Sequence, residues 1–190
     1  MVKKSDTTRQ VDALTNQPVA SLDWDIKSPE DYQRLRAEFA KMPMTPVLTN
    51  VANVEREDHK GRSYDWLLKS EQSGGTIALH RITLYPGFHA TEHNHVQEAE
   101  FFYVLEGEVD ITVGNQRIVG GPGTFAYVPP FATHAFKPAG DTPTVMLHWN
   151  SPGGHERLTS AMVKLAASGE TSAEVKRQTQ EAHEYFFHED

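Results

Sequence analysis

The strongest constraint on the fold is a series of short apolar runs between Val47 and Trp149. Gly, Pro and Asn bound these runs, which alternate with a period of two residues and are rich in β-branched and aromatic side chains. This pattern predicts strands, because successive side chains of an extended chain point to opposite faces of a sheet. No helical pattern separates the runs, which argues against alternating strand and helix units. We therefore predict an all-β core, either a small barrel or a sandwich.

Glycines mark the turns between several predicted strands. Gly107 separates FFYVL from EVDITV, and Gly114 with Asn115 separates EVDITV from QRIVG, so both positions predict tight hairpin turns. In the upstream run GGTIALHRITLYPG the apolar phase shifts between Leu79 and Ile82. The shift predicts a bulge near His80 and Arg81.

Helical patterns flank the predicted core. Ser28 as N-cap and Pro29 at the first helical position open a helix that Pro43 and Pro46 end. After the core, HERLTSAMVKLAAS and TSAEVKRQTQEAHEYFFHED have helical spacing, and the second begins with a capping-box pattern from Thr171 to Glu174. At 190 residues the chain fits one domain with terminal additions. We predict three parts: a tail and helix (1–46), the β core (47–150) and a helical extension (151–190).

Composition excludes several kinds of partner and site. The chain carries 18 basic and 26 acidic side chains, and its net charge of −8 disfavours nucleic acid and anionic membranes. No apolar run is long enough to cross a bilayer and no secretory signal opens the chain, so we expect a cytoplasmic protein. Cysteine is absent, so a metal must be held by nitrogen and oxygen atoms.

One segment concentrates ionisable side chains before the most hydrophobic run. His93 and His95 are two residues apart, so both imidazoles leave the same face of a strand. Glu100 has the wrong parity for the same straight strand, but a bend in the polar stretch between them would bring it close. Glu98 shares the parity of Glu100, and spacing alone does not separate the two. His134 follows a Pro-Pro turn from which its side chain can enter the same cavity.

A carboxylate at the rim of an apolar barrel costs several kcal/mol unless a cation neutralises it. Three imidazoles and one carboxylate suit Fe, Mn, Co, Ni or Zn better than Ca or Mg. We interpret His93, His95, Glu100 and His134 as metal ligands rather than four separate surface residues.

The spacing of these residues resembles that of the cupins. The first cupin motif is matched throughout, and the second is matched except for Phe131 in place of a glycine and Pro138 in place of an asparagine. The matching positions are Gly87, His93, His95, Glu100 and Gly107 for the first motif, and Gly123, Pro129 and His134 for the second. The resemblance selects Glu100 over Glu98. It implies a double-stranded β-helix, or cupin jelly-roll barrel, that binds one divalent transition metal (Fe, Mn, Ni or Co, with Zn as a further candidate).

Residues 64–160 look like the single-domain quercetin-dioxygenase-like cupins. This resemblance implies a dioxygenase that uses dioxygen on a small oxygenated aromatic or enol substrate. In such a reaction Glu100 either remains a metal ligand or takes the substrate's proton as a general base. Two alternatives stay open: a metal-dependent lyase or isomerase that works through an enolate, and a non-catalytic module that binds a small ligand.

Other side chains carry weaker expectations. His148 is expected in a strand, as a hydrogen-bonded wall residue or as support for the metal ligands, and the histidines of the C-terminal extension are expected to face solvent. Apolar residues in both terminal extensions suggest a homodimer. Four aromatic residues are expected to pack in the core; the alternative is that they line a pocket for a flat aromatic substrate. The solvent-facing histidines are His155, His183 and His188; the apolar residues include Tyr185, Phe186 and Phe187; the aromatic residues are Phe102, Tyr127, Phe131 and Phe136.

Overall fold

The computed structural model describes residues 27–42, 44–169, 172–182 and 185–187. Its strands are β1 (Arg56–His59), β2 (Arg62–Leu68), β3 (Ala78–Leu84), β4 (Ala90–His95), β5 (Ala99–Glu106), β6 (Val109–Val113), β7 (Gln116–Gly120), β8 (Phe125–Val128), β9 (His134–Pro138), β10 (Thr144–Ser151) and β11 (Tyr185–Phe187). Its helices are α1 (Pro29–Phe39), α2 (His155–Ala167) and α3 (Ala173–Glu181), with short 3₁₀ turns η1 (Val51–Asn53) and η2 (Ser70–Gln72).

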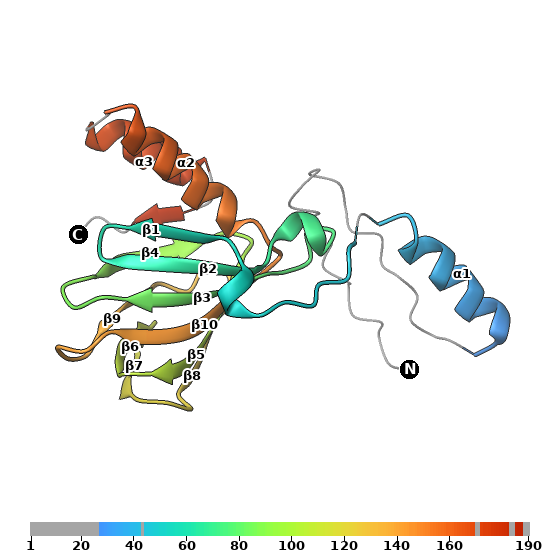
Figure 1. Cartoon of the computed structure of the whole chain (residues 1–190), viewed down its shortest axis with the longest axis horizontal. Helices are drawn as coiled ribbons and strands as arrows, with labels where there is room; N and C mark the ends of the chain where they lie inside the picture. The colour runs from blue at the N-terminus through green and yellow to red at the C-terminus, as the bar shows by residue number, and fades with distance from the viewer. Residues whose placement is uncertain (1–26, 43, 170–171, 183–184, 188–190) are drawn as a thin grey trace, which may run out of the picture.

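Two antiparallel sheets form the barrel seen in Figure 1. One sheet has the order β1-β2-β3-β10-β5-β8 and the other has the order β11-β4-β9-β6-β7. The core cluster takes side chains from both sheets, for example Ile82 and Met146 from the first and Ile111 and Phe136 from the second. The predicted all-β barrel with helices at both ends is confirmed. The residue limits proposed for its three parts stay predictions.

The turn at Gly107 connects the two sheets and does not form a hairpin. β5 pairs with β10 and β8, whereas β6 pairs with β7 and β9. Gly107 has φ +71°, and an added Cβ would lie 2.3 Å from the carbonyl oxygen of Pro143. Only glycine therefore fits this tight crossing. The hairpin expected at Gly114 and Asn115 is confirmed, because Val113 pairs with Gln116.

The irregularity expected near His80 lies on the neighbouring strand β2. The pairing of β2 with β3 shifts register between Trp66 and Leu68, opposite His80 and Leu79. Ala78, His80, Ile82 and Leu84 are all buried, and the register between β3 and β10 runs without a shift. The apolar phase shift in the sequence arises because Leu79 lies on the outer face of β3, between the buried Ala78 and His80. His80 belongs to the interior face, so the period of two is unbroken.

The helix starts follow local capping chemistry. Ser28 caps α1 as predicted, since its hydroxyl oxygen accepts a hydrogen bond from the Asp31 backbone N–H at 3.1 Å. The helix lies apart from the barrel, at the right of Figure 1. α3 begins after Ser172, whose hydroxyl caps the Val175 N–H, and Thr171 lies outside the described residues.

The last described segment is a strand and not the predicted end of a helix. β11 pairs antiparallel with β4, with Tyr185 opposite His95 and Phe187 opposite His93. Aromatic residues favour extended backbone, and pairing satisfies the backbone groups along this side of β4.

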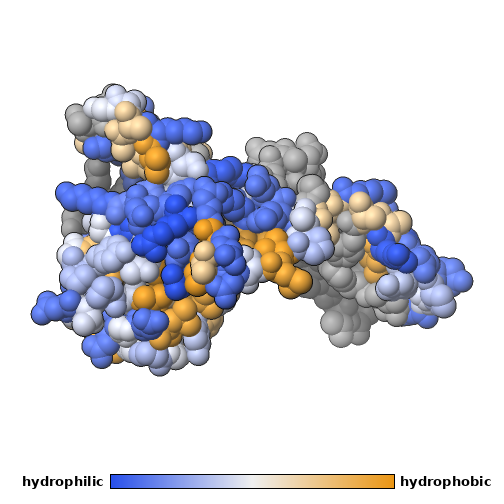
Figure 2. All heavy atoms as spheres, in the orientation of Figure 1, coloured by the Kyte–Doolittle hydropathy of each residue, from blue (hydrophilic) through white to orange (hydrophobic). Residues whose placement is uncertain are grey.

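Surface properties vary around the barrel. Figure 2 shows hydrophilic atoms over β1 and β2, and hydrophobic atoms gathered on the lower part of the barrel, near β5, β8 and β10. Phe125 and Tyr127 of β8 are 54% and 48% exposed there. Among the described residues, no helix has the length and apolar character needed to cross a bilayer.

Phe131 occupies a backbone conformation that normally favours glycine. Its φ is +65°, and its N–H donates to the carbonyl oxygen of His95 at 2.7 Å. This is the position where the second cupin motif has glycine, so the turn keeps the glycine geometry without the glycine. A left-handed conformation costs a non-glycine residue about 1–2 kcal/mol, and here the turn leads directly to His134.

Replacing Phe131 by glycine is expected to stabilise the protein by about 1 kcal/mol, because the strain disappears. Phe131→Ala is the matched control, since it removes the same ring but keeps a Cβ at positive φ. Urea unfolding of the two variants checks this. A glycine variant no more stable than the alanine variant would contradict a strained turn.

Candidate metal centre

Strand pairing brings three imidazoles together. His93 and His95 lie on the inner face of β4, and both are buried. His93 pairs in register with His134 of the neighbouring strand β9. The His93 and His134 ring centroids are 4.1 Å apart, and those of His93 and His95 are 5.1 Å apart. The predicted same-face arrangement of the HxH pair is therefore present.

Glu100 reaches this cluster from β5 of the opposite sheet. Its Oε2 lies 2.7 Å from His134 Nε2, and its Oε1 lies 3.4 Å from His95 Nε2. One donor atom from each of His93, His95, Glu100 and His134 lies within 4.8 Å of all the others. The structure thus brings the four predicted ligands into one buried group.

Backbone carbonyl groups fix the orientation of two imidazoles. His93 Nδ1 lies 2.7 Å from the Thr91 carbonyl oxygen, and His134 Nδ1 lies 3.1 Å from that of Ala132. A carbonyl oxygen can only accept, so each Nδ1–H donates. In the neutral rings the lone pair is then on Nε2, which is the orientation that metal ligands need.

Donors from β10 hold the other side of Glu100. Its Oε1 accepts from Asn150 Nδ2 at 3.1 Å and lies 3.2 Å from His148 Nε2. The Asn150 amide also donates to Glu98 Oε2 at 3.2 Å. Glu98 Oε2 lies 3.8 Å from the Nδ1 atom of His95, whereas Glu100 faces its Nε2 atom. The geometry therefore groups Glu100, and not Glu98, with the three histidines.

The pKa values of Glu100 and His134 shift in opposite directions. Burial raises the pKa of Glu100, but its interactions with His95, His148 and His134 outweigh burial, so this pKa lies well below 4.5. Burial likewise lowers the pKa of His134, yet its hydrogen bond to Glu100 raises it above 6.5 overall. The metal-free site therefore favours a Glu100 carboxylate beside a protonated His134.

The remaining imidazoles favour the neutral form. Burial, followed by the neighbouring His134, lowers the pKa of His93 to about 2, and burial also lowers that of His95. Neutral nitrogen donors beside a buried carboxylate fit a divalent transition metal, which would replace the proton on His134 and release it. These residues fit the metal that the sequence predicts.

Three further imidazoles line the interior behind the four. His80 and His148 have ring centroids 4.5 Å apart, and His155 stacks on His80 at 5.9 Å. On β3 His80 is two residues after the buried Ala78, and on β10 His148 is two residues after the buried Met146. This period of two could have placed both histidines on the inner face. The prediction that His155 faces solvent is wrong, because it is only 9% exposed at the start of α2. His183 and His188 lie outside the described residues.

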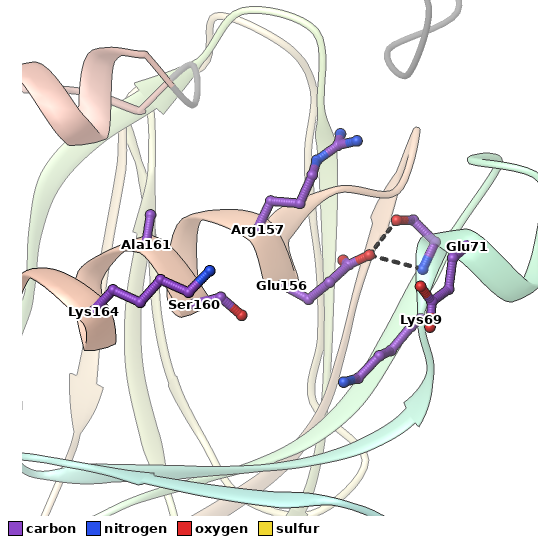
Figure 3. Close-up of a pocket in the computed structure, with 8 residues that line it drawn as sticks. Lys69, Glu71, Glu156, Arg157, Ser160, Ala161 and Lys164 are labelled. Atoms are coloured by element: carbon purple, nitrogen blue, oxygen red, sulfur yellow. Dashed lines mark hydrogen bonds between the residues drawn. The ribbon is translucent and has the colours of Figure 1, made fainter.

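Glu156 anchors α2 so that His155 lies over the cavity. The Glu156 carboxylate accepts from the Ser70 backbone N–H at 2.9 Å and also from the Ser70 hydroxyl, as the dashed lines in Figure 3 show. The pocket in that view lies between η2 and α2. Its cations Lys69, Arg157 and Lys164 point in different directions and do not converge on one point.

A cavity of about 190 Å³ opens beside the four residues. It is lined by Arg62, Tyr64, Ile82, Phe88, His89, Ala90, Thr91, His93, Glu100, Phe136, His148, His155, Leu158, Thr159, Met162 and Gln180. Of the four aromatic residues considered from the sequence, Phe136 lines it and the ring of Phe102 stacks on His148 at 4.4 Å. Tyr127 and Phe131 are 48% and 66% exposed, so neither is a core residue. The pocket role considered for them also fails, since neither lines the cavity.

An antiparallel barrel with a buried three-histidine, one-glutamate group defines the class of this protein. Residues 80–150 match the family model for the cupin domain. With this match and the barrel fold, residues 80–150 form a cupin domain.

Comparison with known proteins places this chain among diverse relatives. It is 28% identical over 110 residues to glucose-6-phosphate isomerase from Thermococcus litoralis, covering 50% of this chain and 58% of that protein's length. An RmlC-like cupin from Shewanella frigidimarina NCIMB 400 has a TM-score of 0.52 and 21% identity, covering 60% of this chain and 98% of its own. KdgF from Halomonas sp. has a TM-score of 0.51 and 13% identity, covering 60% of this chain and 99% of its own. These two structural likenesses support the fold.

His93→Ala is expected to lower the affinity for Mn, Fe, Co, Ni or Zn by more than about 100-fold. Loss of a residue that hydrogen-bonds a metal ligand lowers metal affinity by about 10- to 100-fold, and loss of the ligand itself costs more. Metal analysis after supplementation and dialysis measures this. His89→Ala is the control, because His89 is exposed and outside the group. Wild-type protein that retains no metal, or a His93→Ala variant that retains as much as wild type, would refute the site.

Metal-free protein is expected to lose stability as the pH falls below 6.5. Burial, followed by the neighbouring His148, lowers the pKa of His155 to about 3, and that of His93 falls to about 2. The unfolded chain then binds more protons than the native state. The contribution of each group is present above pH 6.5 and is lost as the pH falls towards its folded pKa. Lowered pKa values at His80 and His95 act in the same direction.

His134 acts in the opposite direction, because its raised pKa gives stability below pH 6.5 that is lost at higher pH. Four lowered histidines outweigh it. Since each strongly lowered histidine contributes roughly 1.4 kcal/mol over two pH units around 6.5, we expect a net loss of about 3–4 kcal/mol between pH 7.5 and 5.5. Urea unfolding in the presence of a chelator measures this loss. His155→Gln is expected to reduce the pH dependence, and a protein equally stable at both pH values would contradict these assignments.

Proposed function

We propose that this protein is a metal-dependent dioxygenase of the quercetinase-like kind, acting on a small oxygenated enol or aromatic substrate. The observation that carries the proposal is that His93 and Glu100 of the four-residue group line a cavity that also has large apolar side chains. These side chains are Ile82, Phe88, Phe136, Leu158 and Met162. The volume of about 190 Å³ lies below the 300–1,000 Å³ common for drug-sized ligands, which favours a small substrate.

The proposed ligands are His93, His95, Glu100 and His134. A bound transition metal would supply Lewis-acid and redox chemistry. The protein's own part is to position groups and move a proton. Glu100 would accept the hydroxyl proton of the substrate, since Asn150 and His148 hold its Oε1 in place. The apolar walls would exclude water from the activated substrate.

A metal-dependent isomerase or lyase is the second candidate. It is supported by the 28% identity to a protein named glucose-6-phosphate isomerase. The same Glu100 would then move a proton at carbon, with no need for dioxygen. The homodimer expected from the terminal apolar residues stays a prediction in either case.

Oxygen dependence separates the two candidates. Metal-loaded protein, screened against small enols and catechols, is expected to consume dioxygen in step with loss of substrate, and Glu100→Gln is expected to slow this by at least about 100-fold. Turnover that continues anaerobically, with deuterium from the solvent entering the product, would replace the dioxygenase proposal by the isomerase or lyase. Zinc protein as active as iron or manganese protein would point the same way.

A further inference from the structure

One cationic side chain lines the cavity beside the candidate metal centre. Arg62, the first residue of β2, is half-buried at this cavity, and Glu100 is the only carboxylate among the lining residues. The other lining side chains are apolar, hydroxyl, amide or imidazole groups. Arg62 is therefore the fixed positive charge that a bound ligand meets away from the four-residue group.

Arg62 lacks the acidic partner that the other strand arginines have. Arg56, Arg81 and Arg117 each contact a carboxylate, at 3.0, 2.8 and 2.8 Å respectively. No described carboxylate lies within ion-pair distance of Arg62, and its Nε is buried without a hydrogen-bond partner. A buried donor without an acceptor is costly, so the site favours a ligand that supplies one.

Aromatic rings hold this guanidinium in position. Its Cζ lies 5.1 Å from the ring centroid of Phe88 and 5.5 Å from that of Tyr64. Contact with rings engages the face of a guanidinium, and the buried Nε–H at its edge has no hydrogen-bond partner. Such a planar edge matches the paired oxygen atoms of a carboxylate or phosphate.

The charge balance of the cavity favours an anion. With a divalent metal (+2), Glu100 (−1) and Arg62 (+1), the cavity and its metal site carry a net charge of +2. Such a cavity attracts an organic anion. A neutral ligand would leave the charge of Arg62 without a partner.

We propose that Arg62 binds a carboxylate or phosphate group of the substrate, so that the substrate is a small organic acid or phosphate ester whose other oxygen atoms reach the metal site. This inference rests on the proposed function for the existence of a substrate. It makes Arg62 a residue that determines substrate specificity at this site.

Calorimetry with matched acids and half-amides tests the proposal. Malonate is compared with malonamate and succinate with succinamate, because each pair differs by one charge at nearly constant shape. Metal-loaded wild type is expected to prefer the diacid of the fitting length by about 10- to 100-fold, the range for a hydrogen bond to a charged group. Arg62→Gln is expected to lose this preference, and Arg62→Lys is expected to keep part of it.

Lys164→Gln is the control, since Lys164 is exposed and lines the other pocket. It is expected to bind all four probes as wild type does. An Arg62→Gln variant that folds, as judged by circular dichroism, and keeps the preference for the diacid would overturn the proposal. Equal losses in the Lys164 and Arg62 variants would overturn it as well.

Metal-free protein titrated with inorganic phosphate separates this inference from the proposed function. Phosphate binding that weakens about 10-fold or more in Arg62→Gln supports the anion site even if no metal binds and no dioxygen is consumed. Stronger binding of phosphate than of any diacid would assign a phosphate ester, and the reverse would assign a carboxylic acid. Wild type that binds neither phosphate nor the diacids would refute the site.

Discussion

The buried carboxylate of Glu100 is the constraint on which the rest of the centre depends. It is 1% exposed, and a bare buried carboxylate costs several kcal/mol. Its two oxygen atoms face His134 on one side and Asn150 with His148 on the other. In metal-free protein the proton on His134 supplies the compensating charge, and a bound cation would supply it more fully. The interior therefore holds one negative charge, on Glu100, next to a position where a proton or a metal cation compensates it.

Backbone register, more than any single side chain, produces this arrangement. His93 lies opposite His134 in the pairing of β4 with β9, and Glu100 lies opposite Asn150 in the pairing of β5 with β10. A slip of one residue in either pair would turn these side chains to the outer face of the barrel. The sharp crossing at Gly107, where a Cβ would meet the Pro143 backbone, helps to set which sheet each strand joins. The same backbone interactions that fold the barrel thus bring the four residues together.

Local signals in the sequence predicted local structure well. Period-two alternation identified the strands, the Ser28 and Pro29 pair identified the start of α1, and the two-residue spacing placed His93 and His95 on one face. Sheet membership could not be predicted in this way, because it depends on pairing between distant segments. For this reason Gly107 predicts a hairpin in the sequence but connects the two sheets in the structure.

Glu100 was separated from Glu98 by resemblance and not by spacing, since both have the same parity. The structure shows the physical difference: Glu98 lies towards His95 Nδ1 and Glu100 towards Nε2. His155 was expected to face solvent, and no role was predicted for His80. His80 follows the interior alternation of its strand, whereas the burial of His155 depends on how α2 packs and has no counterpart in the local pattern.

The extra imidazoles explain how the cavity stays polar without gaining charge. Leucine at the position of His148 would fill similar space but leave Glu100 Oε1 with one contact fewer. Lysine there would bring a second full charge beside the candidate ligands. Buried His80 and His155 favour the neutral form, so they shape the wall without competing with a cation. Positive charge is then left to the metal position and to Arg62. Both positions favour oxygen atoms of a ligand, and the lining between them mixes apolar side chains with neutral polar ones.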